Sequence, residues 1–184
     1  MIDAATVPVS TAPVFVEICR LYVMLALLFA AWGKTMGFAA FRRSLADSFP
    51  SLARVDAAVA FAIVSAEWAI VFLMLIGGAA SRIGIVAALV LLSLFTMVIG
   101  ATLASGRAIV CNCFGASSHR IGGVDVARNL ALTAAAAIAV AGPMGEDAWP
   151  PIQQLTLAGI AMILVLASVW LRDLGWLLRA KPQD

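Results

Sequence analysis

The sequence predicts an all-α fold, a polytopic transmembrane helical bundle with a four-helix core and one further span, five spans in total. Of its 184 residues, 64% are hydrophobic and only 12% are charged, whereas soluble domains average about 25% charged residues. Several apolar runs reach the roughly 20 residues that a helix needs to cross a bilayer. No segment is left for a soluble domain, so residues 1–184 are predicted to be a single integral membrane domain.

The first predicted span covers residues 14–32 and carries Glu17, Cys19 and Arg20 near one end. Residues 1–13 contain no Lys or Arg, and the apolar run is longer than that of a signal peptide, so the run is interpreted as a membrane span. Lys34 follows it directly, where a lysine is expected to snorkel toward the membrane surface.

An amphipathic segment connects the first two spans. Phe38, Phe41, Leu45 and Phe49 recur at helical spacing, which predicts an interfacial helix that ends near Pro50. The remaining spans are expected at 57–77, 83–102, 124–141 and 155–171, with a tight turn at Gly77-Gly78 and a polar loop at 105–123. Four tryptophans fall near the span ends, where indoles anchor helices: Trp32, Trp149, Trp170 and Trp176.

Five spans place the first connection, the 105–123 loop and the C-terminus on one side of the membrane. Nine of the chain's basic residues fall on that side: Lys34, Arg42, Arg43, Arg54, Arg107, Arg120, Arg172, Arg179 and Lys181. Because Lys and Arg accumulate on the cytoplasmic side, the N-terminus is predicted to lie outside. No basic run indicates nucleic-acid binding.

The 105–123 loop contains the pair Cys111 and Cys113. A disulfide between cysteines one residue apart closes a tight ring, and strain makes such a bond easy to reduce. Positive charge nearby favours the reactive thiolate, and Arg107, Arg120 and Arg128 supply it. The spacing therefore favours thiol–disulfide exchange over a permanent crosslink.

Two other interpretations of the cysteines remain open. Cysteines often serve as small apolar packing residues, and Cys19 is interpreted in this way. Cys111, Cys113 and His119 could together bind copper or zinc. A structural zinc site normally has four ligands and the loop offers three, so no metal site is assigned.

Glu67 lies in the middle of the second span. An acid in the hydrocarbon region is costly unless it is paired or neutral, so Glu67 is a candidate functional residue. Arg20, Lys34 and Arg128 are its candidate partners. The alternative is a structural polar link between helices.

Together these motifs resemble the MauE family, within the broader DoxX-like membrane proteins. The resemblance is carried by CNCFG at 111–115, VARN at 126–129, AEWAIVFLMLIGG at 66–78 and the arrangement of Arg20 with Gly33-Lys34. The type member supports methylamine utilisation by helping a disulfide-rich periplasmic subunit to mature. The resemblance implies a multi-pass protein of the bacterial inner membrane.

The resemblance also implies a function. Cys111 and Cys113 would be catalytic, with Arg128, Asn129, Glu67 and Lys34 in supporting roles, in disulfide formation or maturation of a partner protein. The expected partner is a thioredoxin-like protein or a disulfide-containing client, and no cofactor is expected. Whether the chain is itself a thiol–disulfide oxidoreductase is left open. The alternatives are a non-catalytic assembly subunit of a membrane complex and a Cys/His metal carrier.

One conflict stands between the two lines of reasoning. Disulfides of exported proteins form outside the cytoplasm, whereas the charge distribution places the Cys loop inside. The loop could relay electrons across the membrane, or the pair could exchange with cytosolic thiols.

Overall fold

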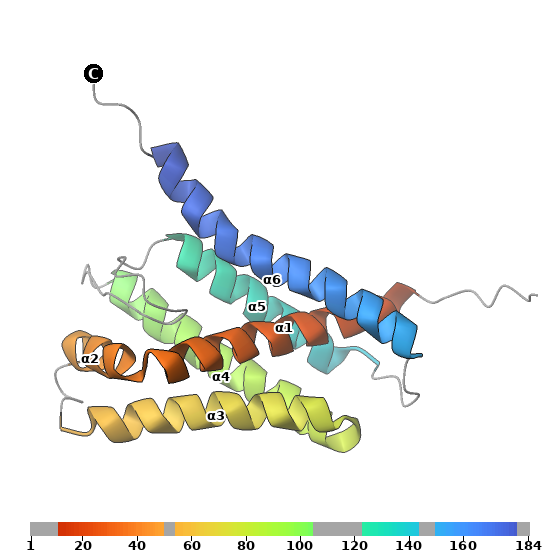
Figure 1. Ribbon diagram of the computed structural model, residues 1–184, viewed down its shortest axis with the longest axis horizontal. Helices are drawn as coiled ribbons and strands as arrows, with labels where there is room; N and C mark the ends of the chain where they lie inside the picture. Colours follow the sequence, from red (N-terminus) through yellow and green to blue (C-terminus); the bar gives the residue numbers. More distant parts are fainter. Residues whose placement is uncertain (1–10, 50–53, 105–122, 144–149, 180–184) are drawn as a thin grey trace, which may run out of the picture.

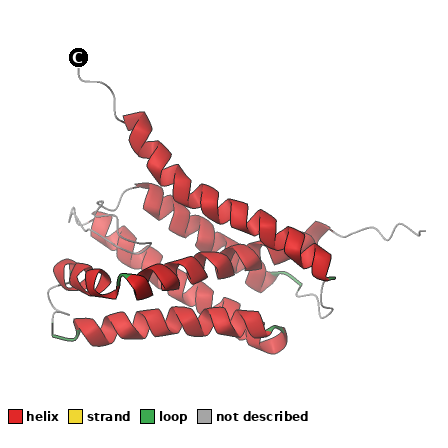
Figure 2. Ribbon diagram, in the orientation of Figure 1, coloured by secondary structure: helices red, strands yellow, loops and turns green. Residues whose placement is uncertain are grey.

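The computed structural model describes residues 11–49, 54–104, 123–143 and 150–179. These ranges contain six helices and no strand (Figure 2). The helices are α1 (Thr11–Met36), α2 (Phe38–Ser48), α3 (Asp56–Ile76), α4 (Gly78–Ala104), α5 (Gly123–Ala141) and α6 (Pro151–Arg179). All except α2 are long and apolar enough to cross a membrane. The predicted fold class, a polytopic helical bundle with five spans, is confirmed.

Helix α1 is the centre of the bundle. It contacts α3, α5 and α6, while α4 closes the other side by packing against α3 and α5. Of the most apolar stretch of α1, 56% is buried inside the protein, compared with 33% or less for the other spans. Helix α6 lies along the outside of α1 (Figure 1). The architecture is therefore a core of α1, α3, α4 and α5 with α6 added to it.

Small side chains allow the core helices to approach closely. Ala31, Ala88, Ala136 and Ala139 are completely buried. A Cβ atom added to Gly84 of α4 would lie 2.7 Å from the side chain of Met74 and 3.1 Å from its backbone nitrogen. In lipid, where apolar side chains gain little from leaving their solvent, such close packing is a main source of helix association.

The outer surface is apolar, as a lipid-facing surface must be. On α4, one exposed stripe at helical spacing consists of Ile83, Val86, Val90, Leu94 and Met97. On α6, Ile152, Leu155 and Trp170 are exposed. Exposed apolar side chains along whole helices agree with a multi-pass membrane protein and not with a water-soluble bundle.

The connections differ in detail from the sequence-based prediction. Gly77 and Gly78 both have positive φ, +83° and +53°, so the expected tight turn is present. Helix α4 begins at Gly78, directly after this turn, and not near residue 83. Helix α6 continues to Arg179, beyond the predicted end at residue 171.

The short helix α2 turns back against the start of α3. Its Phe41 is buried against Ala60 and Val64, with Phe38 and Leu45 beside it. Arg42 forms an ion pair with Asp56 at 3.2 Å. Phe49 follows the helix as its C-cap. The aromatic face that predicted an interfacial helix therefore packs on the protein itself.

Candidate functional site

A cavity of about 300 Å³ lies between α1, α2, α3, α4 and α5. It is at the end of the bundle where α1 and α4 finish and α3 and α5 begin, on the left in Figure 1. Its walls are mostly apolar and include the rings of Phe41, Phe49 and Phe95. This volume is at the lower end of the range typical of small-molecule sites, about 300–1,000 Å³.

One wall of the cavity holds a buried ion pair. The Lys34 Nζ atom donates a hydrogen bond to Glu67 Oε1 at 2.6 Å, and the two side chains are 2% and 1% exposed. The ammonium group also lies 5.7 Å from the centre of the Phe41 ring and 5.9 Å from that of Phe95, within cation–π range. The second carboxylate oxygen, Glu67 Oε2, is buried and has no hydrogen-bond partner among the described residues.

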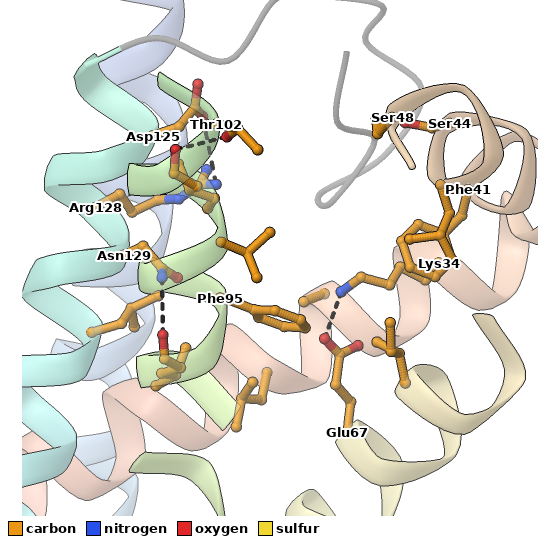
Figure 3. A pocket seen from close by; sticks show the side chains of 18 of the residues that line it. Lys34, Phe41, Ser44, Ser48, Glu67, Phe95, Thr102, Asp125, Arg128 and Asn129 are labelled. Carbon is orange, nitrogen blue, oxygen red and sulfur yellow. Dashed lines mark hydrogen bonds and ion pairs between the residues drawn. The ribbon is translucent and has the colours of Figure 1, made fainter. Parts of the chain in front are cut away.

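The opposite wall is polar and comes from the first turns of α5. Asp125 pairs with Arg128 at 3.7 Å. The Asn129 amide donates to Thr96 Oγ1 at 2.7 Å and to the Leu92 carbonyl at 3.2 Å, so it links α5 to α4. Figure 3 shows these residues facing Lys34 and Glu67 across the cavity, with Phe95 between the two groups.

All four residues predicted to support the cysteines line this one cavity: Lys34, Glu67, Arg128 and Asn129. They come from three helices and are far apart in sequence. Of the three candidate partners of Glu67, the structure selects Lys34. The expectation that Lys34 snorkels to the surface is wrong, because the carboxylate of Glu67 holds its ammonium group inside the bundle.

The predicted catalytic pair, Cys111 and Cys113, lies outside the described residues, as does His119. The segment that carries them joins Ala104, the last residue of α4, to Gly123, the first of α5. Thr102 and Asp125, close to these two helix ends, both line the cavity. Within the described ranges, no three His, Cys, Asp or Glu side chains gather as metal ligands would.

The third cysteine belongs to the other end of the bundle. Cys19 is 7% exposed and packs in the core with Val71, Met74 and Ile85. It lies 15 residues before Lys34 on α1, or about 22 Å along the helix axis. Cys19 is therefore a packing residue, as its sequence position suggested.

Arg20 is also accounted for at that end. Its guanidinium binds Glu17 through two nitrogens, donates to Ser81 Oγ at 2.7 Å and reaches the Met74 carbonyl at 3.4 Å. This cluster ties α1 to the turn between α3 and α4. Arg20 is thus not a partner of Glu67.

The family of methylamine utilisation protein MauE matches residues 12–142 of the chain. The chain belongs to the MauE family. The match covers nearly all of α1 and the whole of α2 to α5, with all the described residues that line the cavity, whereas α6 lies beyond it. No curated protein and no solved structure matches the chain significantly. The four-helix core and the described cavity residues therefore fall within the part of the chain that matches the family.

Sequence reasoning missed several residues of this MauE cavity. Asp125 was not singled out from the sequence, although it pairs with Arg128. Phe95 had no signal, because it is one apolar residue among many in α4. Ser44 and Ser48 on α2 also line the cavity. The signal for these two was present: they lie on the same helical face as Phe41 and Leu45.

Proposed function

We propose that this MauE-family membrane protein carries out thiol–disulfide exchange through Cys111 and Cys113, and so supports disulfide formation or maturation of a partner protein. The observation that carries the proposal is the convergence of charged residues near the two helix ends between which the motif lies in the sequence. The two helix ends that hold the Cys segment border a cavity containing a buried Lys34–Glu67 pair and an Asp125–Arg128 pair. Ionisable groups within a membrane domain are expensive and mark functional sites by default.

The exchange proceeds through a mixed disulfide. A thiolate of a reduced partner attacks one sulfur of the Cys111–Cys113 disulfide, so that a partner–protein S–S bond forms and the other cysteine leaves as a thiolate. The second partner thiolate then attacks the mixed disulfide. The partner ends with a disulfide, and the Cys pair ends as a dithiol after gaining two electrons and two protons.

Arg128 has a defined part in this scheme. It lies five residues after the first residue of α5 and is 11% exposed in its pairing with Asp125. A guanidinium close to the returning end of the Cys segment favours the thiolate form of the pair. The partner we propose is a thioredoxin-like protein or a client with its own disulfides.

We also propose that the N-terminus lies outside and that the protein resides in the bacterial inner membrane. Arg42, Arg43 and Arg54 belong to the connection between α1 and α3. At the other end of the bundle, Arg82 follows the α3–α4 turn and Arg20 is bound to Glu17. This distribution supports a cytoplasmic position for the α2 end of the bundle.

The test uses a peptide that the sequence provides. Trypsin cleaves after Arg107 and Arg120 and releases residues 108–120, which contain Cys111 and Cys113 but not Cys19. The purified protein is equilibrated with oxidised or reduced dithiothreitol, alkylated and digested. Mass spectrometry should show the peptide switching reversibly between an unlabelled disulfide form and a doubly alkylated form.

The buried Cys19 is the internal control of this experiment, since it should stay unlabelled until the protein is denatured. A 108–120 peptide that carries two free thiols under every condition would exclude the proposed exchange. A non-catalytic assembly subunit would then remain, and a double Cys111→Ala, Cys113→Ala variant should still support its partner.

A further inference from the structure

We infer that the cavity between α1 and α5 binds a quinone and its reduced form, the quinol, which are lipid-soluble ring compounds with two ring oxygens, and that a hydroxyl of the quinol donates a hydrogen bond to Glu67 Oε2. The binding claim rests on the described residues alone. The electron-transfer step that follows from it rests on the proposed function.

The first argument is the unused hydrogen-bonding capacity of Glu67. Its carboxylate is 1% exposed and accepts from Lys34 through Oε1, while Oε2 has no partner in the described part of the chain. A buried polar atom left without a hydrogen bond costs about 1–3 kcal/mol, more when it is charged. An O–H donor in the adjoining cavity would remove that cost.

The second argument is the charge of the cavity. Among the described residues that line it, the ionisable ones are two cations, Lys34 and Arg128, and two anions, Glu67 and Asp125. They form two ion pairs, at 2.6 Å and 3.7 Å. Because these formal charges cancel, the described walls offer no net attraction to an ion, and a neutral ligand is favoured over a phosphate or carboxylate.

The third argument is the shape and chemistry of the walls. Apart from these pairs the lining is mainly aliphatic, with the rings of Phe41 and Phe95 on either side of the Lys34 ammonium group. Flat ring systems pack well against aromatic side chains. A few polar groups within an apolar cavity are what orient a ligand of mixed character.

We place the entrance of the ligand at the α4 wall of the cavity. Val98 lines it and is 44% exposed on α4. Val98 therefore borders both the cavity and the apolar surface of the protein. A ligand dissolved in the bilayer could enter beside it with its ring first and leave an apolar tail among the lipids.

The ligand provides the electron and proton acceptor that oxidation of the Cys pair requires. When the proposed exchange has left Cys111 and Cys113 as a dithiol, an acceptor for two electrons and two protons is needed. A quinone takes up both and becomes a quinol as the S–S bond forms, so atoms and electrons balance. Glu67 Oε2 then accepts the hydrogen bond of the newly formed hydroxyl.

The test measures the affinity of decylubiquinone and decylubiquinol for the purified full-length protein in lipid nanodiscs, by equilibrium partitioning. Decylbenzene, which has an apolar ring and tail but no ring oxygens, is the comparison ligand. We expect decylubiquinol to bind at least ten times more tightly than decylbenzene. Equal binding of the two, or no binding of decylubiquinol, would show a cavity that holds only lipid and would overturn the inference.

Two variants with a matched control locate the site. Glu67→Gln should weaken decylubiquinol binding about tenfold, and Val98→Trp should weaken the binding of both ligands by narrowing the cavity. Val90→Trp changes an equally apolar, 55% exposed position on the same helix outside the cavity, and should leave the affinities unchanged. Wild-type affinity in both cavity variants would contradict the assignment, and wild-type affinity in Glu67→Gln alone would contradict the assigned hydrogen bond.

A third variant separates this inference from the proposed function. Cys111→Ser, Cys113→Ser protein should bind decylubiquinol like the wild type, because no described contact of the cavity involves the cysteines. If decylubiquinol binds but quinone does not oxidise the cysteines of peptide 108–120, the electron transfer is refuted and the binding site remains supported. If the Cys pair exchanges disulfides reversibly but the protein does not bind decylubiquinol, the binding site is refuted and the proposed exchange remains supported.

Discussion

The pair formed by Lys34 and Glu67 is the most demanding feature at the scale of single residues. Both side chains are almost fully buried, and Glu67 lies near the middle of α3. Each charge is tolerable there only because the other compensates it. The pair thereby fixes the last turn of α1 against α3 and gives the cavity a polar wall.

A double-mutant cycle tests this dependence. Lys34→Met should lower the free energy of unfolding by about 3–5 kcal/mol, since it leaves an uncompensated buried carboxylate. The double variant Lys34→Met, Glu67→Met should lose less stability than either single variant, because it leaves no unpaired charge inside the protein. The free energy is measured by titrating the protein in mixed micelles with sodium dodecyl sulfate.

The control for this cycle is Arg42→Met. It removes an ion pair whose arginine is 48% exposed, and exposed pairs contribute about 0–1 kcal/mol. If Lys34→Met lowers the free energy of unfolding no more than Arg42→Met does, the buried pair contributes no more to stability than an exposed pair. A folded double variant whose 108–120 peptide no longer changes redox state would give the pair a functional role as well.

Some residues of the site could be recognised from the sequence, and others could not. Glu67 was recognisable as a candidate because an acid stands out in an apolar span, and Arg128 because it follows the Cys motif. The choice of Lys34 over Arg20 as partner was not predictable. It depends on which helix faces pack together, because α1 carries both basic residues, Lys34 in its last turn and Arg20 fourteen residues earlier.

Helix packing is the main determinant at the scale of elements. Two of the core helices, α3 and α4, are joined by the Gly77-Gly78 turn and pack tightly at Gly84, where the lack of a side chain leaves room for Met74. The sequence predicted the turn from its glycine pair. It did not single out Gly84, because the sequence does not show which helix packs against a single glycine in an apolar helix.

Gly84→Ala should therefore destabilise the protein by about 1–3 kcal/mol, the usual cost of overpacking a well-packed core. Gly100→Ala is the matched control on the same helix, since an added Cβ there has no atom within 4 Å and alanine is the better helix former. The comparison uses the same unfolding titration. Equal stability of the two variants would contradict the close α3–α4 contact.

At the scale of the whole molecule, the alternation of five spans places α2 and the α4–α5 ends together and the α3–α4 turn at the other end (Figure 1). Composition and span length were sufficient to predict this alternation. The cavity was not predictable from them, since it depends on which faces of five helices meet. Orientation in the membrane follows from the basic residues and stays a prediction.

Cysteine labelling in intact cells tests that orientation. In a Cys19→Ala, Cys111→Ser, Cys113→Ser background, Ala79→Cys marks the α3–α4 turn and Ala39→Cys marks α2, both at exposed positions. The outer membrane of the cells is permeabilised and the inner membrane is left intact. A maleimide that does not cross the inner membrane should then label Ala79→Cys, and it should label Ala39→Cys only after lysis. The reverse pattern would place the N-terminus in the cytoplasm.

The central claim, that Cys111 and Cys113 exchange disulfides with another protein, is tested most directly by trapping the mixed disulfide. Cells producing Cys111→Ser or Cys113→Ser are treated with acid and alkylated, and the proteins are separated without reductant. In at least one single variant the remaining cysteine should be held in an adduct that reductant releases and that the double variant lacks. Absence of any such adduct from both single variants, at wild-type expression levels, would contradict the account.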